Sequence, residues 1–309
     1  ASDSCRQGPD YILETSGLNK MEHRSSCLTS DGGYIVVGLT NDFSSDPYKD
    51  DILVTKFTNT GNVEWSKVYA VESKIFCSSI LELTTGDYIV SGRHSLDGYD
   101  YNACLLNISS SGELNWSKKF TDPDHSYYDE EFDFLSLGTD SGFVVMGKIM
   151  DPAYIDVKLI ITKFENNGTL TWCRKKNFTA YSHCDSLIPC SDGGYMAGYS
   201  YLGAPSGYKS SCMSKYNQTG EIEYTNSSYR YDDDICHSVT ELADGSFLRF
   251  GMTRTSSFQI RDALVIKTDV QGNLVWAKTI DTGEGEEGRY IKETPDGDLL
   301  ITAYRRVSD

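Results

Sequence analysis

The sequence is short of positive charge: 28 lysines and arginines stand against 45 aspartates and glutamates in 309 residues, a formal net charge of −17. Nucleic acid and anionic membrane surfaces are therefore poor partners, whereas a cationic ligand or a metal ion is electrostatically acceptable. The sequence also lacks any apolar run near the roughly eighteen residues that a membrane-spanning helix needs. We therefore expect no membrane span and no nucleic-acid partner.

Short catalytic motifs are missing as well. There is no Gly-x-Ser-x-Gly elbow, no P-loop and no His-Glu-x-x-His, which are signatures of common hydrolase and nucleotide-binding sites. Abundant carboxylates could still form a glycosidase pair in three dimensions. From the missing motifs we predict that the protein is not an enzyme and has no cofactor.

What the sequence does contain is a repeat. A turn and strand of the type Asp-Gly-Gly-Tyr-Ile-Val-Val-Gly recurs every 52 to 55 residues, and its six copies begin at Asp31, Thr85, Asp140, Asp192, Asp244 and Asp296. A fixed period near fifty residues is typical of arrays in which each unit buries its apolar face on a neighbour. The repeat therefore predicts a single domain over residues 1–309.

Each repeat reads as four short strands joined by glycine, asparagine and aspartate turns. In the first repeat these strands cover residues 24–29, 34–40, 51–57 and 63–69, which are rich in β-branched and aromatic residues. A large aromatic follows the second turn glycine by four residues and is expected to pack between successive sheets; these aromatics are Trp65, Trp116, Trp172, Tyr224 and Trp276. Six such units predict an all-β, six-bladed β-propeller.

The two ends of the chain share the sixth unit. The segment around Tyr11, in residues 1–20, resembles a fourth strand, and residues 288–294 and 298–305 resemble a first and a second strand. No third strand remains for this sheet. Either both termini close a three-stranded sheet within one chain, or another molecule supplies a strand to the open edge. The second arrangement would make the protein a polymer subunit.

The three recurring motifs, Asp31-Gly-Gly-Tyr-Ile-Val-Val-Gly, Asp51-Ile-Leu-Val-Thr-Lys and Gly61-Asn-Val-Glu-Trp-Ser-Lys, resemble repeats of secreted bacterial β-propellers. They are also similar to repeats in protist extracellular proteins. The resemblance covers nearly the whole chain and implies the propeller fold, but it brings no catalytic motif. The third and fifth repeats depart from the Gly-Gly turn, which affects the expected turn type only.

Cysteines and sugar acceptors favour a secreted protein. Nine cysteines fit an oxidising compartment, and Ala1 in place of a methionine is read as the end left by signal cleavage. Six Asn-x-Ser/Thr triplets predict glycosylation at Asn107, Asn115, Asn167, Asn177, Asn217 and Asn226. A bacterial secreted protein with unused triplets is the alternative.

Cysteine positions repeat between units and suggest disulfides. Cys77 with Cys104, and Cys184 with Cys212, occupy equivalent places in the second and fourth repeats. First and third strands lie about 9.6 Å apart, which opposes such bonds unless the second strand has ended. Cys5 with Cys27 and Cys173 with Cys190 are weaker pairs, and the odd count leaves one thiol free or intermolecular.

Metal sites are possible but weakly supported. A ring of zinc ligands could use His23, His183 and His237 on first strands, although close Cys-x-x-Cys spacing is absent. Calcium could be held where acids precede first strands and are expected to gather near one channel mouth. These acids are Asp129, Glu130, Glu131, Asp232, Asp233, Asp234, Glu284, Glu286 and Glu287. Packing and solvation explain the same residues without a metal.

Two functions follow as hypotheses. The first is a secreted, glycosylated structural or adhesive module that self-associates or binds other extracellular proteins or glycans, including a filament built by strand exchange. The second is a carbohydrate-binding or carbohydrate-cleaving propeller using loop aromatics such as Tyr99, Tyr101, Tyr154 and Tyr208.

Overall fold

The computed structural model describes ten stretches of the chain: residues 21–40, 50–69, 74–95, 100–122, 129–151, 157–178, 182–202, 209–228, 233–254 and 261–306. They contain 22 strands in antiparallel sheets. None of these stretches holds a helix long and apolar enough to cross a membrane. The predicted closing strand around Tyr11 and the loop residues Tyr99, Tyr154 and Tyr208 lie outside the described stretches, as do Cys5 and Asp232.

Five sheets have four strands each, ordered as in the sequence. The first sheet contains β1 (Met21–Leu28), β2 (Tyr34–Thr40), β3 (Asp51–Phe57) and β4 (Val63–Tyr69). The second contains β5 (Lys74–Glu82), β6 (Tyr88–Ser95), β7 (Asn102–Ile108) and β8 (Leu114–Phe120). The third contains β9 (Asp129–Leu137), β10 (Phe143–Met150), β11 (Val157–Phe164) and β12 (Leu170–Phe178).

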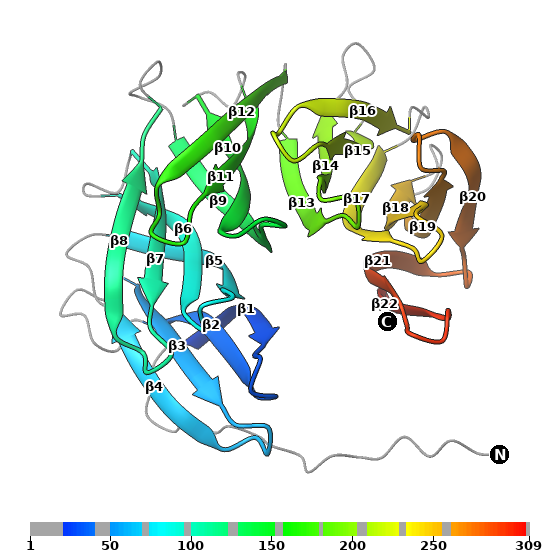
Figure 1. Cartoon of the computed structure of the whole chain (residues 1–309). Helices are drawn as coiled ribbons and strands as arrows, with labels where there is room; N and C mark the ends of the chain where they lie inside the picture. Colours follow the sequence, from blue (N-terminus) through cyan, green and yellow to red (C-terminus); the bar gives the residue numbers. More distant parts are fainter. Residues whose placement is uncertain are drawn as a thin grey trace.

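The fourth sheet contains β13 (Ser182–Pro189), β14 (Tyr195–Leu202), β15 (Lys209–Tyr216) and β16 (Ile222–Ser227). The fifth contains β17 (Asp233–Glu241), β18 (Phe247–Arg254), β19 (Arg261–Thr268) and β20 (Leu274–Ile280). The last sheet has two described strands, β21 (Gly285–Glu293) and β22 (Leu299–Arg306). The sheets follow one another around a ring with the first strands innermost (Figure 1).

A turn repeats at one end of each complete sheet, and an ion pair accompanies it in four of the five. In the first, Gly32 takes a φ of 83°, which favours glycine, and the Asp31 carboxylate accepts from the Gly33 amide at 2.9 Å. Lys56, almost wholly buried on β3, places its ammonium 2.7 Å from Asp31. The same aspartate–lysine pair forms in the third, fourth and fifth sheets, so two of the recurring motifs hold each other in place.

The core is divided among the interfaces between sheets. Five apolar clusters fill the spaces from the first sheet round to β21, one at each junction. The outer aromatics confirm the predicted packing: Trp65 lies against Gly112 of the next sheet, and Trp172 against Gly220. For Trp276 the following sheet has no such turn within the described residues.

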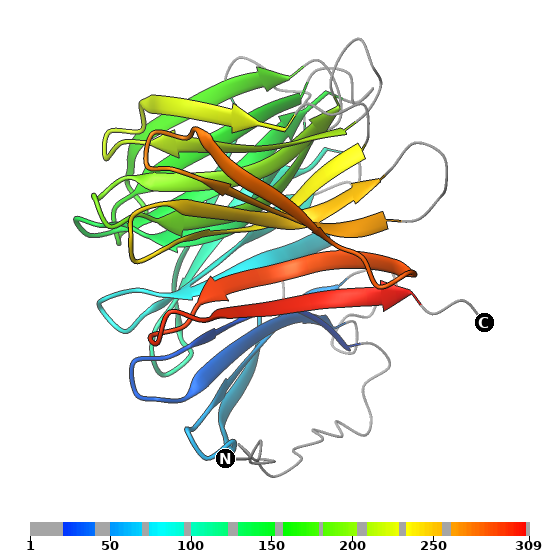
Figure 2. The ribbon, with the colours of Figure 1, turned by 90° about the vertical axis from the view of Figure 1, so that its right-hand side faces the viewer.

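The two-stranded sheet leaves an open edge. It lies between the fifth sheet and the first sheet (Figure 2), and no described strand pairs with the outer side of β22. Large apolar side chains on this strand are exposed, Leu300 by 54% and Tyr304 by 55%. An unpaired, apolar strand edge is a template for a further strand.

Candidate functional site

Every innermost strand carries a one-residue β-bulge at the same place, seven residues before the repeat's anchor. The extra residues are Arg24, Ser78, Asp133, Asp185, His237 and Arg289. A bulge bends its strand and re-aims the side chain of the extra residue, and bulges are frequent beside functional sites. The bulges therefore place a ring of mostly charged residues along the innermost strands of the propeller.

A glycine faces the bulge in most repeats. Gly147 on β10 pairs with Phe132, beside the bulged Asp133, and a Cβ at Gly147 would lie only 1.9 Å from the Glu131 carbonyl oxygen. Gly92 and Gly251 are equally crowded by the strand that they face. The fourth repeat has Tyr199 at this position and the sixth has Ala303.

The bulged residues of neighbouring sheets meet in a charged network. His237 lies between two carboxylates, with Nδ1 3.7 Å from Asp185 and Nε2 3.0 Å from Glu287. Glu287 also pairs with Arg289 at 2.9 Å and with Arg261 at 3.3 Å. Asp185 accepts a hydrogen bond from Ser200 at 2.9 Å. This half of the ring is a connected set of hydrogen bonds and ion pairs that spans three sheets.

The third sheet contributes a second group. Lys148 lies 3.5 Å from Glu131 and 3.7 Å from Asp133, and Arg93 of the preceding sheet lies 3.2 Å from Glu131. Burial, and then the negative charge of Glu131, raises the pKa of Asp133 to about 7, against the opposing effect of Lys148. A carboxyl whose pKa is raised by burial is a candidate for general acid–base chemistry, and Asp133 is such a group.

The histidines do not form the proposed zinc ring. His237 is engaged by carboxylates, and burial lowers the pKa of His183 to about 4. In the described stretches, the one group of three or more candidate metal ligands consists of carboxylates: Asp262, Asp281 and Glu286.

The acids that precede the first strands have different surroundings. Consecutive residues on a strand face opposite sides. Glu130 is buried between sheets, where its oxygen accepts from the Asp122 amide, whereas Glu131 joins the charged network. Asp129 accepts from the backbone amide of Tyr101, the loop aromatic that the structure does describe.

The predicted disulfides are corrected by the strand pairing. Cys77 and Cys104 both lie opposite Gly92, on either side of β6, and Cys184 and Cys212 both lie opposite Tyr199, on either side of β14. The intervening strand keeps their backbones two strand spacings apart. All described cysteines are free thiols, namely Cys27, Cys77, Cys104, Cys173, Cys184, Cys190, Cys212 and Cys236.

The sugar acceptors differ in accessibility. Asn115, Asn167 and Asn177 are exposed, and Asn217 and Asn226 are half-buried. Asn107 is 2% exposed, and its Oδ1 accepts from Asn115. It occupies the β7 position that the ion-pairing lysine holds in other sheets, which explains its burial and opposes a glycan there.

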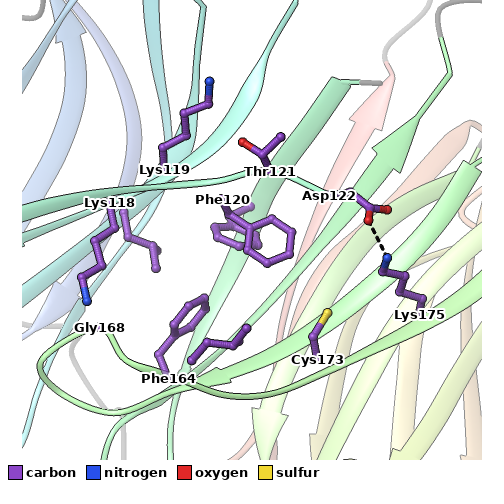
Figure 3. Close-up of a pocket in the computed structure, with 12 residues that line it drawn as sticks. Lys118, Lys119, Phe120, Thr121, Asp122, Phe164, Gly168, Cys173 and Lys175 are labelled. Atoms are coloured by element: carbon purple, nitrogen blue, oxygen red, sulfur yellow. Dashed lines mark hydrogen bonds and ion pairs between the residues drawn. The ribbon is translucent and has the colours of Figure 1, made fainter. Parts of the chain in front are cut away.

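A pocket of about 440 Å³ opens on the outside between the second and third sheets. Figure 3 shows its aromatic floor, with Phe120 and Phe164, and its rim of lysines. The rim is engaged within the protein, because Lys175 pairs with Asp122 at 2.7 Å and Lys118 donates to the Asn167 carbonyl at 2.9 Å. Its apolar floor and basic rim are suited to an amphipathic, anionic group.

Sequence reasoning missed the bulge ring. Its position in the repeat is constant. The bulged residue always stands seven positions before the anchor, and in four repeats a glycine stands seven positions after the anchor. The residue at the bulged position differs between repeats and is arginine, serine, aspartate or histidine. A search for recurring identities therefore passes over this position.

No protein-family model matches the sequence, and no curated protein matches it. Solved structures share the fold. The β-propeller domain of the trilobed protease from Pyrococcus furiosus, described as having an open velcro topology, aligns with a TM-score of 0.56 at 11% identity. The alignment covers 94% of this chain and 79% of that one.

The NanB sialidase from Streptococcus pneumoniae aligns with a TM-score of 0.56 at 9% identity, covering 94% of this chain and 66% of that one. A puromycin hydrolase aligns at 0.50 and 12% identity, covering 93% and 52%. These likenesses establish a β-propeller fold. Because enzymes share this fold, the prediction that the chain is not an enzyme is corrected: missing short motifs do not exclude catalysis here.

Proposed function

We propose that the protein is an extracellular module that assembles with further copies of itself by adding a strand to the open edge of β22. The added strand is the segment around Tyr11 of a second copy, and it would complete a sixth blade. The observation that carries the proposal is the edge of β22, which pairs with no other described strand on its outer side and exposes Leu300, Ile301 and Tyr304. Backbone hydrogen bonds along such an edge provide affinity for an added strand.

The geometry of this exchange favours an open assembly. The donor segment and the acceptor edge are different surfaces, so each copy would offer one and receive the other. Head-to-tail contacts of this kind form rings if the rotation closes and filaments if it does not. Among the described residues, the last sheet has no third strand beside β22, which is where the incoming segment would pair.

The test compares two substitutions in the full chain. Leu300 on β22 and Val275 on β20 are both 54% exposed. Leu300 lies on the second strand of its sheet, where the complete sheets pair with a third strand, whereas β20 is the fourth and outermost strand of a complete sheet. We expect Leu300→Lys to weaken self-association about tenfold or more, because a lysine on the edge opposes strand addition, and Val275→Lys to leave it unchanged. Light scattering and electron microscopy give the readout. A strictly monomeric protein at high concentration would contradict the proposal and indicate closure by its own N-terminal segment.

A second candidate function, carbohydrate binding or cleavage, is favoured by Asp133. Glycosidases pair a protonated carboxyl, often with a raised pKa, with an ionised carboxylate. Asp133, whose pKa is raised by burial, and the neighbouring Glu131 place two carboxyl groups beside Lys148 in one network. The network is narrowly accessible, since the Asp133 side chain is 14% exposed.

A glycan array and a panel of glycosidase substrates test this second function. For any substrate that is cleaved, Asp133→Asn is expected to lower the rate at least a hundredfold without loss of folding. The asparagine keeps the shape of the side chain but cannot transfer the proton. If the wild-type protein neither binds nor cleaves any glycan, this function is wrong.

A further inference from the structure

Three carboxylates meet where the fifth sheet joins the two-stranded sheet. Asp262 lies near the start of β19, Asp281 follows β20, and Glu286 lies near the start of β21. One oxygen atom from each lies within 4.8 Å of the others. Glu286 is 4% exposed, Asp262 is half-buried and Asp281 is exposed, so the group reaches from the interior to solvent.

The buried oxygens of this group lack partners. Glu286 Oε1 accepts from the Thr282 hydroxyl, but Glu286 Oε2 and Asp262 Oδ1 are buried without a hydrogen bond from any described residue. Asp281 accepts from the Gly283 amide at 2.7 Å. No ion pair joins any of the three to a lysine or arginine of the described stretches. Burying unpaired carboxylates is costly, and burial together with Asp281 and Glu286 raises the pKa of Asp262.

The junction between the second and third sheets provides an internal reference. By strand register, Asn102, Thr121 and Glu130 stand where Asp262, Asp281 and Glu286 stand. There Thr121 donates a hydrogen bond to Asn102 Oδ1 at 3.1 Å. Lys119 acts on Glu130, and Lys175 neutralises the adjacent Asp122. The reference junction therefore holds two buried acids, Glu130 and Asp122, with lysines near both, whereas the last junction brings three carboxylates together without a lysine or arginine partner among the described residues.

We propose that Asp262, Asp281 and Glu286 bind a divalent cation of the calcium class. Calcium takes six to eight oxygen ligands and accepts flexible carboxylate arrangements completed by water. The all-oxygen donor set is unsuited to zinc, which prefers nitrogen and sulfur. Asp281 at the surface gives the ion a path inwards. The bound ion fastens β21 to the fifth sheet, because its ligands come from both.

Calorimetric titration of the EDTA-treated full chain with calcium chloride tests the site. We expect one saturable ion per chain and a rise of several degrees in Tm at 1 mM calcium. The double variant Asp262→Asn/Asp281→Thr, which copies the reference junction, should lose affinity at least tenfold and unfold at a higher temperature than wild type in EDTA. The matched control Asp87→Asn/Asp298→Asn removes the same charge elsewhere and should bind calcium as wild type does.

The single variant Asp281→Thr changes only the exposed ligand and keeps the test valid if the double variant fails to fold. It should weaken binding about fivefold or more. Absence of saturable calcium heat in the full chain would overturn the proposal, as would unchanged affinity in the Asp281→Thr and double variants. Binding is measured for the single chain, so its outcome is independent of self-association.

Discussion

Two junctions between sheets are built from equivalent positions but carry different charged groups. One lies between the second and third sheets, and the other lies between the fifth sheet and β21. At the first, Thr121 donates to Asn102, and the two buried acids Glu130 and Asp122 are offset by Lys119 and Lys175. At the second, three carboxylates meet. The contrast teaches that the repeat determines which positions come into contact, whereas the residue types at those positions determine whether their charges balance without a bound ion.

The two regions also differ in completeness. The early junctions are closed on the outside by an aromatic against the next sheet's turn glycine, as with Trp172 and Gly220. Beyond the fifth sheet, the described residues include no third and fourth strands to receive Trp276. Within the described residues, the outer part of the last junction therefore lacks the contact between aromatic ring and turn glycine that the earlier junctions have.

The largest effect is expected from the outer aromatics. Trp172→Ala should lower the free energy of unfolding by about 3 kcal/mol, because it removes a ring packed against Gly220 and Tyr195. Trp276→Ala should cost about 1 kcal/mol, since fewer partners surround that ring. Urea denaturation of both variants measures the difference. Equal losses would show that the last sheet is as well covered as the others.

A smaller effect concerns pH at the reference junction. Burial is the main reason that the pKa of Glu130 is raised to about 7 from its ordinary 4.5. The folded state then binds more protons than the unfolded state between about pH 4.5 and 7, so this group makes stability fall as pH rises through that window. We expect Glu130→Gln to remove about 2 kcal/mol of this fall between pH 5 and 7.

Denaturation curves at several pH values, with and without calcium, give the measurement. Because this junction has lysines and no cluster of acids, the effect of Glu130→Gln should be the same in calcium and in EDTA. A calcium-dependent change would mean that the reference junction also binds an ion, and the contrast between the two junctions would fail.

The smallest effect is expected from converting the reference junction into the acidic one. Asn102→Asp/Thr121→Asp should cost about 1 kcal/mol in EDTA, because like charges repel but Lys119 and Lys175 offset part of the repulsion. Urea denaturation beside the conservative variant Thr121→Ser separates charge from packing. A stabilised acidic variant would contradict the electrostatic reasoning used for both junctions.

Much of the fold was predictable because its signals are local. The strand–turn–strand unit, the turn glycines and the place of the large aromatics follow from residues a few positions apart. The pairing of Asp31 with Lys56 links two motifs that recur together, and it could have been inferred from that recurrence. The disulfide between Cys77 and Cys104 was wrongly predicted because equivalence in sequence does not place two residues on adjacent strands.

The site was much less predictable. His237 meets Asp185 and Glu287, which lie about fifty residues away on either side, and only the packing of neighbouring sheets brings them together. Glu130 and Glu131 are adjacent in sequence yet belong to different environments, because one faces a sheet interface and the other the charged network.

The sequence by itself determined the repeating β-sheet unit, since period, turn residues and β-branched strands are properties of neighbouring positions. Only the tertiary structure decided which side chains from different repeats share a site: the bulge ring, the buried Asn107 and the carboxylates at β21. Their contacts cross from one sheet to the next, and the free energy of a charge there depends on burial and on partners that no local pattern contains.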